Sequence, residues 1–415
     1  MKTRKQRVSV KNINGYTVIL APSEMDTVTV RACVGAGFIH ESSSTLGIHH
    51  LLEHVLISSF KPCHSDCILY WDKQGCILNA TTDNTVVSYF IKGLPDIVDT
   101  MVQYIISILI RPTLEESVLQ REKNAVLTEL KMTMNSPDYP LTNAFNEAFF
   151  VPYGLSHYGD ASIHLHNLPK FTLNDLQKAH QLYTSENIVF VVHGNFSESI
   201  LRIFRENLPN KPLPPPVQIP CFSYQPAFLH VPHTSSTVRT ILGFPMNDYY
   251  EHGPIINSLL SVLLFNELRT KNNLVYGIKA SVNTDHCTSC LMIQFECIQE
   301  VFVKTLRILF HLLLTAHLDP SILKGVQRKM IYGYQTKYAY DKYYASYLYH
   351  KRTLLTKPQL IKKVKSFTVK QFTSFMKETI KFQQCTLVYQ YPTSFHVNWD
   401  TFLKIDTRGK VQLLS

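Results

Sequence analysis

A proline-rich segment near the middle of the chain limits most strongly how these 415 residues can fold. Residues 208–220, LPNKPLPPPVQIP, contain six prolines in thirteen positions. Because proline fixes φ and lacks an amide N–H, such a run favours an extended spacer over a helix or a central strand. The spacer leaves two nearly equal parts. We therefore expect two domains, residues 1–207 and 221–415, joined by a linker at 208–220.

The two parts also resemble each other in the order of their predicted elements. Each begins with two strands and a helix, and each ends in a β-rich run. These segments are 17–20, 27–34, a helix from about 46 and 187–192 in the first part, and 227–231, 236–244, about 254–268 and 385–389 in the second. The pattern predicts a duplicated α+β fold, in which each copy is a mostly antiparallel sheet with helices on one face.

Composition and charge argue against several classes of protein. Hydrophobic residues make up 45% of the chain and charged residues 17%, which is typical of a folded globular protein. No apolar run reaches the roughly 18 residues that a membrane span needs. The first seven residues, MKTRKQR, are basic but precede no apolar segment, so we predict no secretory signal. The net charge of +10 is scattered and accompanies no recognised DNA- or RNA-binding motif, so nucleic acid is not the expected partner.

The nine cysteines predict a reducing compartment. An odd number without an export signal indicates free thiols, as in the cytoplasm, the mitochondrial matrix or a viral factory. Two close pairs, Cys63 with Cys67 and Cys287 with Cys290, each lie beside a histidine and could supply half of a structural zinc site. Neither pair has an obvious second half, so we interpret these cysteines as small hydrophobic residues.

The stretch GIHHLLEHVL, residues 47–56, predicts an amphipathic helix with an unusual polar face. Ser44 or Thr45 is the expected N-cap, with Gly47 in the first turn. At 100° per residue the leucines and isoleucine group on one side, and His50, Glu53 and His54 group on the other. This face could be an ordinary solvated surface or a metal site.

Metal chemistry would require this spacing. Imidazoles at i and i+4 lie one above the other and can bind one Zn²⁺, and a glutamate between them can accept a proton from metal-bound water. The order H-x-x-E-H is a recognised zinc-hydrolase signature. A third ligand is still needed. The predicted helix 119–130 carries Glu122 and Glu129 on one face, two turns apart.

These residues together resemble the pitrilysin/insulinase family of zinc peptidases, which includes the mitochondrial processing peptidases. The family has H-x-x-E-H followed about 75 positions later by a glutamate, and here 129 − 54 = 75. The resemblance implies that His50, His54 and Glu129 bind one Zn²⁺ per chain. It also implies that Glu53 is the catalytic base, that Glu122 supports the site, and that both domains have the processing-peptidase fold.

Further segments extend the resemblance to substrate binding. Asn79, Ala80 and Thr81 are similar to the family's edge strand, which pairs with extended substrate. Phe265, Arg269 and Tyr276 lie in a run close to the insulin-degrading members, where an arginine and a tyrosine at this spacing bind substrate or stabilise the transition state. The run 46–58 is also similar to the poxviral members. Thr81 stands where family members commonly have an aromatic residue, so the resemblance does not predict the shape of the substrate-side pockets.

The sequence therefore predicts a metalloendopeptidase that hydrolyses extended peptides or unfolded segments. The chain has half the length of the insulinase-type enzymes. The resemblance thus implies a homodimer or a heterodimer with a second half, in which Arg269 and Tyr276 act on the partner's site. The alternative is a catalytically silent scaffold member of the same family.

Overall fold

The computed structural model divides the chain into two compact units. One contains residues 1–135, 157–219 and 339–356, and the other contains residues 136–156, 220–338 and 357–415. The residues that the structure describes are 8–60, 63, 66–150, 160–209, 226–232, 234, 236–246, 252–283, 289–336, 355–391, 403–405 and 411–413.

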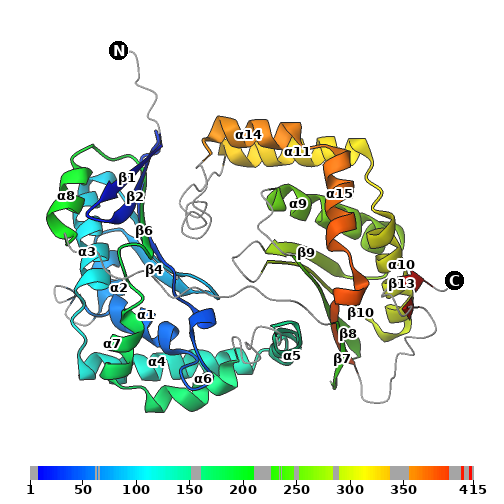
Figure 1. The fold of residues 1–415 in the computed structure, drawn as a ribbon, viewed down its shortest axis with the longest axis horizontal. Coiled ribbons are helices and arrows are strands. Elements are labelled where there is room, and N and C mark those ends of the chain that lie inside the picture. Colours follow the sequence, from blue (N-terminus) through cyan, green and yellow to red (C-terminus); the bar gives the residue numbers. More distant parts are fainter. Residues whose placement is uncertain are drawn as a thin grey trace. The chain divides into compact units, whose positions relative to one another are not determined.

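The first unit is an α+β layer (Figure 1). Its strands are β1 (Ser9–Ile13), β2 (Tyr16–Pro22), β3 (Val28–Val34), β4 (Ile77–Thr82), β5 (Val87–Gly93) and β6 (Ile188–Gly194). Its helices are η1 (Phe38–His40), α1 (Ile48–Ile57), α2 (Cys67–Asp72), η3 (Pro95–Ile97), α3 (Val98–Ile110), α4 (Glu116–Met134), α6 (Ala161–Asn167), η5 (Leu168–Lys170), α7 (Leu173–His180) and α8 (Ile200–Asn207).

Its six strands form one sheet in the order β1-β2-β6-β3-β5-β4. Every neighbouring pair is antiparallel except β2 and β6. The central strand β6 is buried at all seven positions, as its continuous apolar run requires. Strand β4 lies at the edge, and its side chains from Ile77 to Thr81 alternate between exposed and buried. Helix α3 packs on β3 and β5, and α1 packs on β4, α4 and α7.

The second unit has the same kind of fold. Its strands are β7 (Ala227–Pro232), β8 (Thr237–Pro245), β9 (Gly277–Asn283), β10 (Cys290–Ile298), β11 (Thr386–Tyr391), β12 (Leu403–Ile405) and β13 (Val411–Leu413). Its helices are α5 (Tyr139–Phe150), α9 (Gly253–Leu264), the π-helix η6 (Phe265–Lys271), η7 (Gln299–Val301), α10 (Phe302–Thr315), α11 (Pro320–Thr336), α14 (Lys357–Ser366), α15 (Val369–Thr379) and η8 (Phe382–Gln384).

The main sheet of this unit has the order β7-β11-β8-β10-β9, with β7 and β11 parallel and the other pairs antiparallel. The two sheets share one strand order. Strands β2 to β6 of the first unit correspond along the chain to strands β7 to β11 of the second. In both sheets the first of these five lies beside the fifth, followed by the second, the fourth and the third. The predicted α+β fold with two similar sheets is confirmed, and the shared strand order is what a duplicated fold would give.

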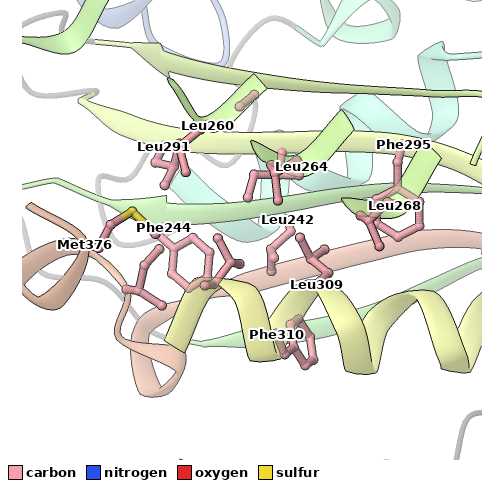
Figure 2. Close-up of a cluster of buried hydrophobic side chains, with 14 of the residues drawn as sticks. Leu242, Phe244, Leu260, Leu264, Leu268, Leu291, Phe295, Leu309, Phe310 and Met376 are labelled. Carbon is pink, nitrogen blue, oxygen red and sulfur yellow. The ribbon is translucent and has the colours of Figure 1, made fainter. Parts of the chain in front are cut away.

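The core of the second unit lies between one face of the sheet and helices α9, α10 and α15. Figure 2 shows part of it, including Phe244 from β8, Leu264 from α9 and Leu309 from α10, all of which are buried. Helix α5 packs against β7, β8 and β11. At Gly243 the rings of Phe145 and Phe149 lie so close that a Cβ would meet them at 2.5 and 3.1 Å.

Helix α5 bears on the predicted domains 1–207 and 221–415. It is encoded in the first part of the chain, but it packs on the sheet that the second part forms. Most of the predicted linker, residues 210–220, lies outside the described residues. The domain boundary at 208–220 therefore stays a prediction.

The prediction of reduced thiols is wrong for one pair. Cys63 and Cys67 form a disulfide, because the turn before α2 brings their Cα atoms to 4.7 Å. Five other cysteines, all buried, form no disulfide (Cys33, Cys76, Cys290, Cys297 and Cys385), and Cys221 and Cys287 lie outside the described residues. In the described part of the chain no single helix is long and apolar enough to cross a membrane, although the bent pair Gln299–Thr315 and Pro320–Gln335 passes by length and composition. The compartment stays a prediction.

Candidate functional site

Helix α1 begins at a glycine that no other residue could easily replace. Gly47 is the N-cap, with a left-handed φ of 94°, and no side chain caps the helix from this position. The carboxylate of Glu41 instead accepts hydrogen bonds from the amides of Gly47 (2.7 Å) and His49 (2.8 Å). The predicted cap at Ser44 or Thr45 is therefore wrong, because the loop folds back and brings an acidic group to the positive end of the helix.

Three side chains from two helices meet beside α1. His50 and His54 project from α1 with ring centroids 4.9 Å apart, and Glu129 projects from α4. Glu129 Oε2 lies 3.4 Å from His50 Nε2 and 3.5 Å from His54 Nε2. One ligand atom from each residue falls within 4.8 Å of the others, and among the described residues no other such group of three is found. Two imidazole nitrogens and one carboxylate oxygen are a ligand set that zinc accepts in catalytic sites.

Glu122 contacts one of these candidate ligands, His54, at its other ring nitrogen. Its Oε2 is 3.4 Å from His54 Nδ1, and its Oε1 accepts from Ser58 Oγ (2.9 Å) and from the Arg121 guanidinium (2.9 and 3.0 Å). Burial would raise the pKa of Glu122, but the contacts with His54, Ser58 and Arg121 outweigh it and hold the pKa below its ordinary value. Glu122 is therefore a carboxylate that fixes the ring of His54 and directs Nε2 outward.

Glu53 lies on the same face of α1 and is only 6% exposed. The Thr82 hydroxyl donates to its Oε2 at 2.6 Å. Burial raises the pKa of Glu53, against the lowering effects of Thr82, His50 and His54. A buried carboxylate with a raised pKa beside such a candidate metal site is suited to accept and return a proton.

A cavity of about 860 Å³ opens over these side chains. It is lined by the candidate ligands, by Glu53 and Glu122, and by residues 79–82 of the edge strand β4. In that strand the amide of Ala80 donates to Asn79 Oδ1 at 2.8 Å. The predicted substrate residues Asn79, Ala80 and Thr81 therefore lie at the same cavity as the predicted metal ligands.

His164, from α6, forms another part of the cavity wall. It is 4% exposed, its ring centroid lies 5.4 Å from that of His50, and its Nε2 has no hydrogen-bond partner among the described residues. Burial, together with the charges of His50 and His54, lowers the pKa of His164 to about 3, so the ring is neutral. Gly47 lies against this ring, and a Cβ at Gly47 would be 1.9 Å from His164 Cδ2.

The remaining predicted residues lie in the second unit. Phe265 and Arg269 belong to the π-helix η6, and Tyr276 directly precedes β9. The Arg269 guanidinium lies 5.5 Å from the centre of the Tyr276 ring and donates to Asn273 Oδ1 at 3.0 Å. Phe265 is 46% exposed and Tyr276 is 86% exposed. The structure thus brings Arg269 and Tyr276 together on an exposed surface of their own unit.

Sequence reasoning missed several side chains of the first unit. Neither helix spacing nor the family resemblance assigns a role to Ser58, Arg121 or His164, and Thr82 directly follows the predicted strand residues 79–81. Spacing along one helix could not reveal them, because each contacts the site from another element or from a helix end. Only Arg121, next to Glu122, had a signal in the sequence.

Comparison with known families gives two adjoining matches. Residues 17–158 match the family described as Insulinase (Peptidase family M16), and residues 170–321 match the family described as Peptidase M16 inactive domain. Together the matched residues cover more than two thirds of the chain.

Among curated proteins, the uncharacterized zinc protease YmxG of Bacillus subtilis is 27% identical over 194 residues, which are 46% of this chain and 46% of YmxG. The uncharacterized zinc protease Rv2782c of Mycobacterium tuberculosis is 24% identical over 68% of each chain. The beta subunit of the mitochondrial-processing peptidase of Dictyostelium discoideum is 22% identical over 48% of this chain and 42% of that protein. The match thus spans less than half of the length of YmxG and of the Dictyostelium subunit.

Solved structures share the fold. A peptidase M16 inactive domain from Pseudomonas fluorescens superposes with a TM-score of 0.81 at 16% identity, covering 94% of this chain and 99% of that one. A protease from Helicobacter pylori gives a TM-score of 0.77 at 19% identity, covering 93% of this chain and all of that one. The periplasmic protease PqqL of Escherichia coli gives 0.72 at 14% identity, where 95% of this chain covers 47% of PqqL.

Proposed function

Because the chain belongs to the insulinase family of peptidases, M16, we propose that it is a zinc-dependent endopeptidase. Its substrates would be extended peptides or unfolded segments of proteins. The observation that carries this proposal is the convergence of His50, His54 and Glu129 beside the buried carboxylate of Glu53. Relatives named as zinc proteases support it.

The donor set fits the metal that the family uses. His50, His54 and Glu129 would hold one Zn²⁺ per chain, and their nitrogen and oxygen atoms already lie close together. When bound, zinc supplies Lewis-acid chemistry, which acidifies water and polarises a carbonyl oxygen. Glu122 would keep His54 in the ligating orientation through Nδ1.

Glu53 would act as the general base. It would accept a proton from the water that attacks the scissile carbonyl and then deliver it to the leaving amine. The substrate would add as a further strand along residues 79–81 of β4, whose edge has no strand partner among the described residues. Pairing through the main chain would make recognition tolerant of substrate sequence.

We further propose that Arg269 and Tyr276 contribute from a partner subunit. Their mutual contact and exposure suit a pair that binds substrate held elsewhere. Two relatives are named as parts of assemblies, the beta subunit of the processing peptidase and core protein I of the ubiquinol-cytochrome-c reductase complex. In the homodimer or heterodimer, zinc and the base would come from one chain and the Arg/Tyr pair from the other.

Zinc content and cleavage of an unfolded test peptide are the direct test. Glu53→Gln should keep zinc and lower kcat about 10²- to 10⁴-fold, whereas Glu129→Gln should lose zinc and activity together. Glu116→Gln is the matched control, since it makes the same change on α4 at a residue that does not line the cavity. Zinc-loaded wild-type protein that cleaves no peptide in a library would refute the proposal and favour the scaffold alternative.

Subunit mixing tests the partner contribution. Glu53→Gln and Tyr276→Phe should each be poorly active as homo-oligomers. If the two sites complement each other between chains, mixing the two variants should restore a fraction of the wild-type rate. A cleaving protein that sedimentation shows to be monomeric would contradict this arrangement.

A further inference from the structure

One hydrogen bond joins the proposed base to the proposed substrate strand. Thr82 is the last residue of β4, and its hydroxyl donates to Glu53 Oε2 at 2.6 Å. Leu78 and Ala80 are buried on alternate positions of β4, so Thr82 belongs to the same face of the strand, the face toward α1. The distance is typical of a hydroxyl bound to a charged carboxylate.

This hydrogen bond distinguishes the two carboxylate oxygens of Glu53, because only Oε2 accepts it. Oε2 is occupied by Thr82, and no other hydrogen-bond partner of Glu53 is found among the described residues. Glu53 as a whole is only 6% exposed, so its carboxylate depends largely on the protein for hydrogen bonds at Oε2. With Oε2 occupied, the torsions of the Glu53 side chain are restricted, and Oε1 stays free for the attacking water.

The position of Thr82 in the sheet adds a second effect. It pairs with Val87 of β5 in the same register that pairs Ala80 with Tyr89, so the hydroxyl is fixed to the strand that would bind substrate. The Tyr89 hydroxyl in turn contacts the Tyr183 hydroxyl at 2.8 Å in the buried layer beneath. A shift of β4 would therefore move the partner of the base together with the substrate.

We propose that Thr82 is a positioning residue that holds one oxygen of Glu53 and thereby aligns the base with a substrate bound along β4. This role rests on the proposed peptidase function. It predicts a loss in kcat with little change in KM or in zinc content, because neither the substrate residues nor the metal ligands are altered.

The kinetic test compares two substitutions that differ in the hydroxyl. Thr82→Val keeps the branched shape and should lower kcat about 10- to 100-fold, while Thr82→Ser keeps the hydroxyl and should stay within about threefold of wild type. Thr29→Val is the control, since it makes the same change in β3 of the same sheet at a buried residue that does not line the cavity. It should leave kcat unchanged.

An unfolding cycle tests the contact without using activity. Urea midpoints are measured by Trp71 fluorescence in a Trp399→Phe background, which leaves Trp71 as the one tryptophan of the chain, for the parent protein, Thr82→Val, Glu53→Ala and the double variant. Thr82→Val should lower the midpoint in the wild-type background and have little effect in the Glu53→Ala background, because its partner is then absent.

The outcomes separate the two proposals. An active wild type with unchanged kcat in Thr82→Val refutes the positioning role alone, as does loss of zinc in Thr82→Val or failure of Thr82→Ser to preserve the rate. Additive midpoints in the cycle refute the contact. A zinc-loaded but inactive wild type refutes the peptidase proposal. If the unfolding cycle of that inactive protein is non-additive, the Thr82–Glu53 hydrogen bond stabilises the fold only, and the positioning role is refuted as well.

Discussion

Replacing Gly47 with alanine should damage the proposed metal site through a contact with His164. Two costs are expected. The left-handed φ of 94° disfavours an L-residue by about 1–2 kcal/mol. The new Cβ would also lie 1.9 Å from Cδ2 of the buried His164 ring, and overpacking of this kind adds about 1–3 kcal/mol. The total is about 2–5 kcal/mol, a large part of a typical domain's stability.

Gly75 provides a matched comparison in the same unit. It has a φ of 70°, but a Cβ at this position would meet no atom within 4 Å. Gly75→Ala should therefore cost only the backbone term of about 1–2 kcal/mol. The difference between the two glycines isolates the contact with His164.

The assay is urea unfolding followed by Trp71 fluorescence in the same Trp399→Phe background, together with zinc titration. Gly47→Ala should unfold at lower urea than Gly75→Ala and bind zinc more weakly, because α1 carries two of the proposed ligands and begins at this glycine. Adding His164→Ala should relieve the overpacking and bring the cost of Gly47→Ala close to that of Gly75→Ala. Equal midpoints for the two glycine variants, or no relief in the double variant, would refute the reasoning.

Three further predictions follow from the same region. Glu122→Gln should weaken zinc binding about 10- to 100-fold in a chelator competition, because His54 Nδ1 loses its carboxylate partner; unchanged affinity would contradict this. Tyr104→Phe should cost about 1 kcal/mol in urea unfolding, since the Tyr104 hydroxyl donates to the last carbonyl of α1, that of Ile57, at 2.8 Å; a cost near zero would contradict it. Burial lowers the pKa of His49 to about 3 and that of His40 to about 4, so both rings stay neutral in the folded chain while the unfolded chain gains protons near 6.5. The contribution of these two rings to the free energy of unfolding should therefore be fully present above pH 6.5 and fall below it by up to about 2.7 kcal/mol per pH unit. His49→Leu should remove its share of this contribution in urea titrations between about pH 5 and 7, and an unchanged pH dependence would contradict this.

The candidate site was predictable where it follows the period of a helix. His50, Glu53 and His54 project from one face of α1 because i, i+3 and i+4 are neighbours on any helix, and Glu122 and Glu129 share a face of α4 for the same reason. The resemblance to a family supplied what periodicity cannot, namely that these two faces meet. The duplicated strand order was likewise foreshadowed by the similar order of elements in the two halves.

Contacts made by folded loops were not predictable. The cap of α1 comes from Glu41, six residues before Gly47, and only the path of the intervening chain makes this acid a better partner than Ser44 or Thr45. His164 is separated from Gly47 by more than a hundred residues and carries no periodic signal. Nothing in the local sequence of α5 indicates which sheet this helix covers.

The placement of α5 has a consequence for dividing this protein into fragments. A fragment ending at residue 207 would keep α5 without its sheet, so Phe145 and Phe149 would be exposed to water. A fragment beginning at residue 221 would leave a gap at Gly243, where those rings lie. We expect each half to aggregate when it is expressed alone. Co-expressed halves should associate, because α5 of one half can pack on strands β7, β8 and β11 of the other. The second copy of the fold thus takes one helix, α5, from the part of the chain before the proline-rich linker. A gene divided at that linker would therefore not encode two fragments that each fold alone.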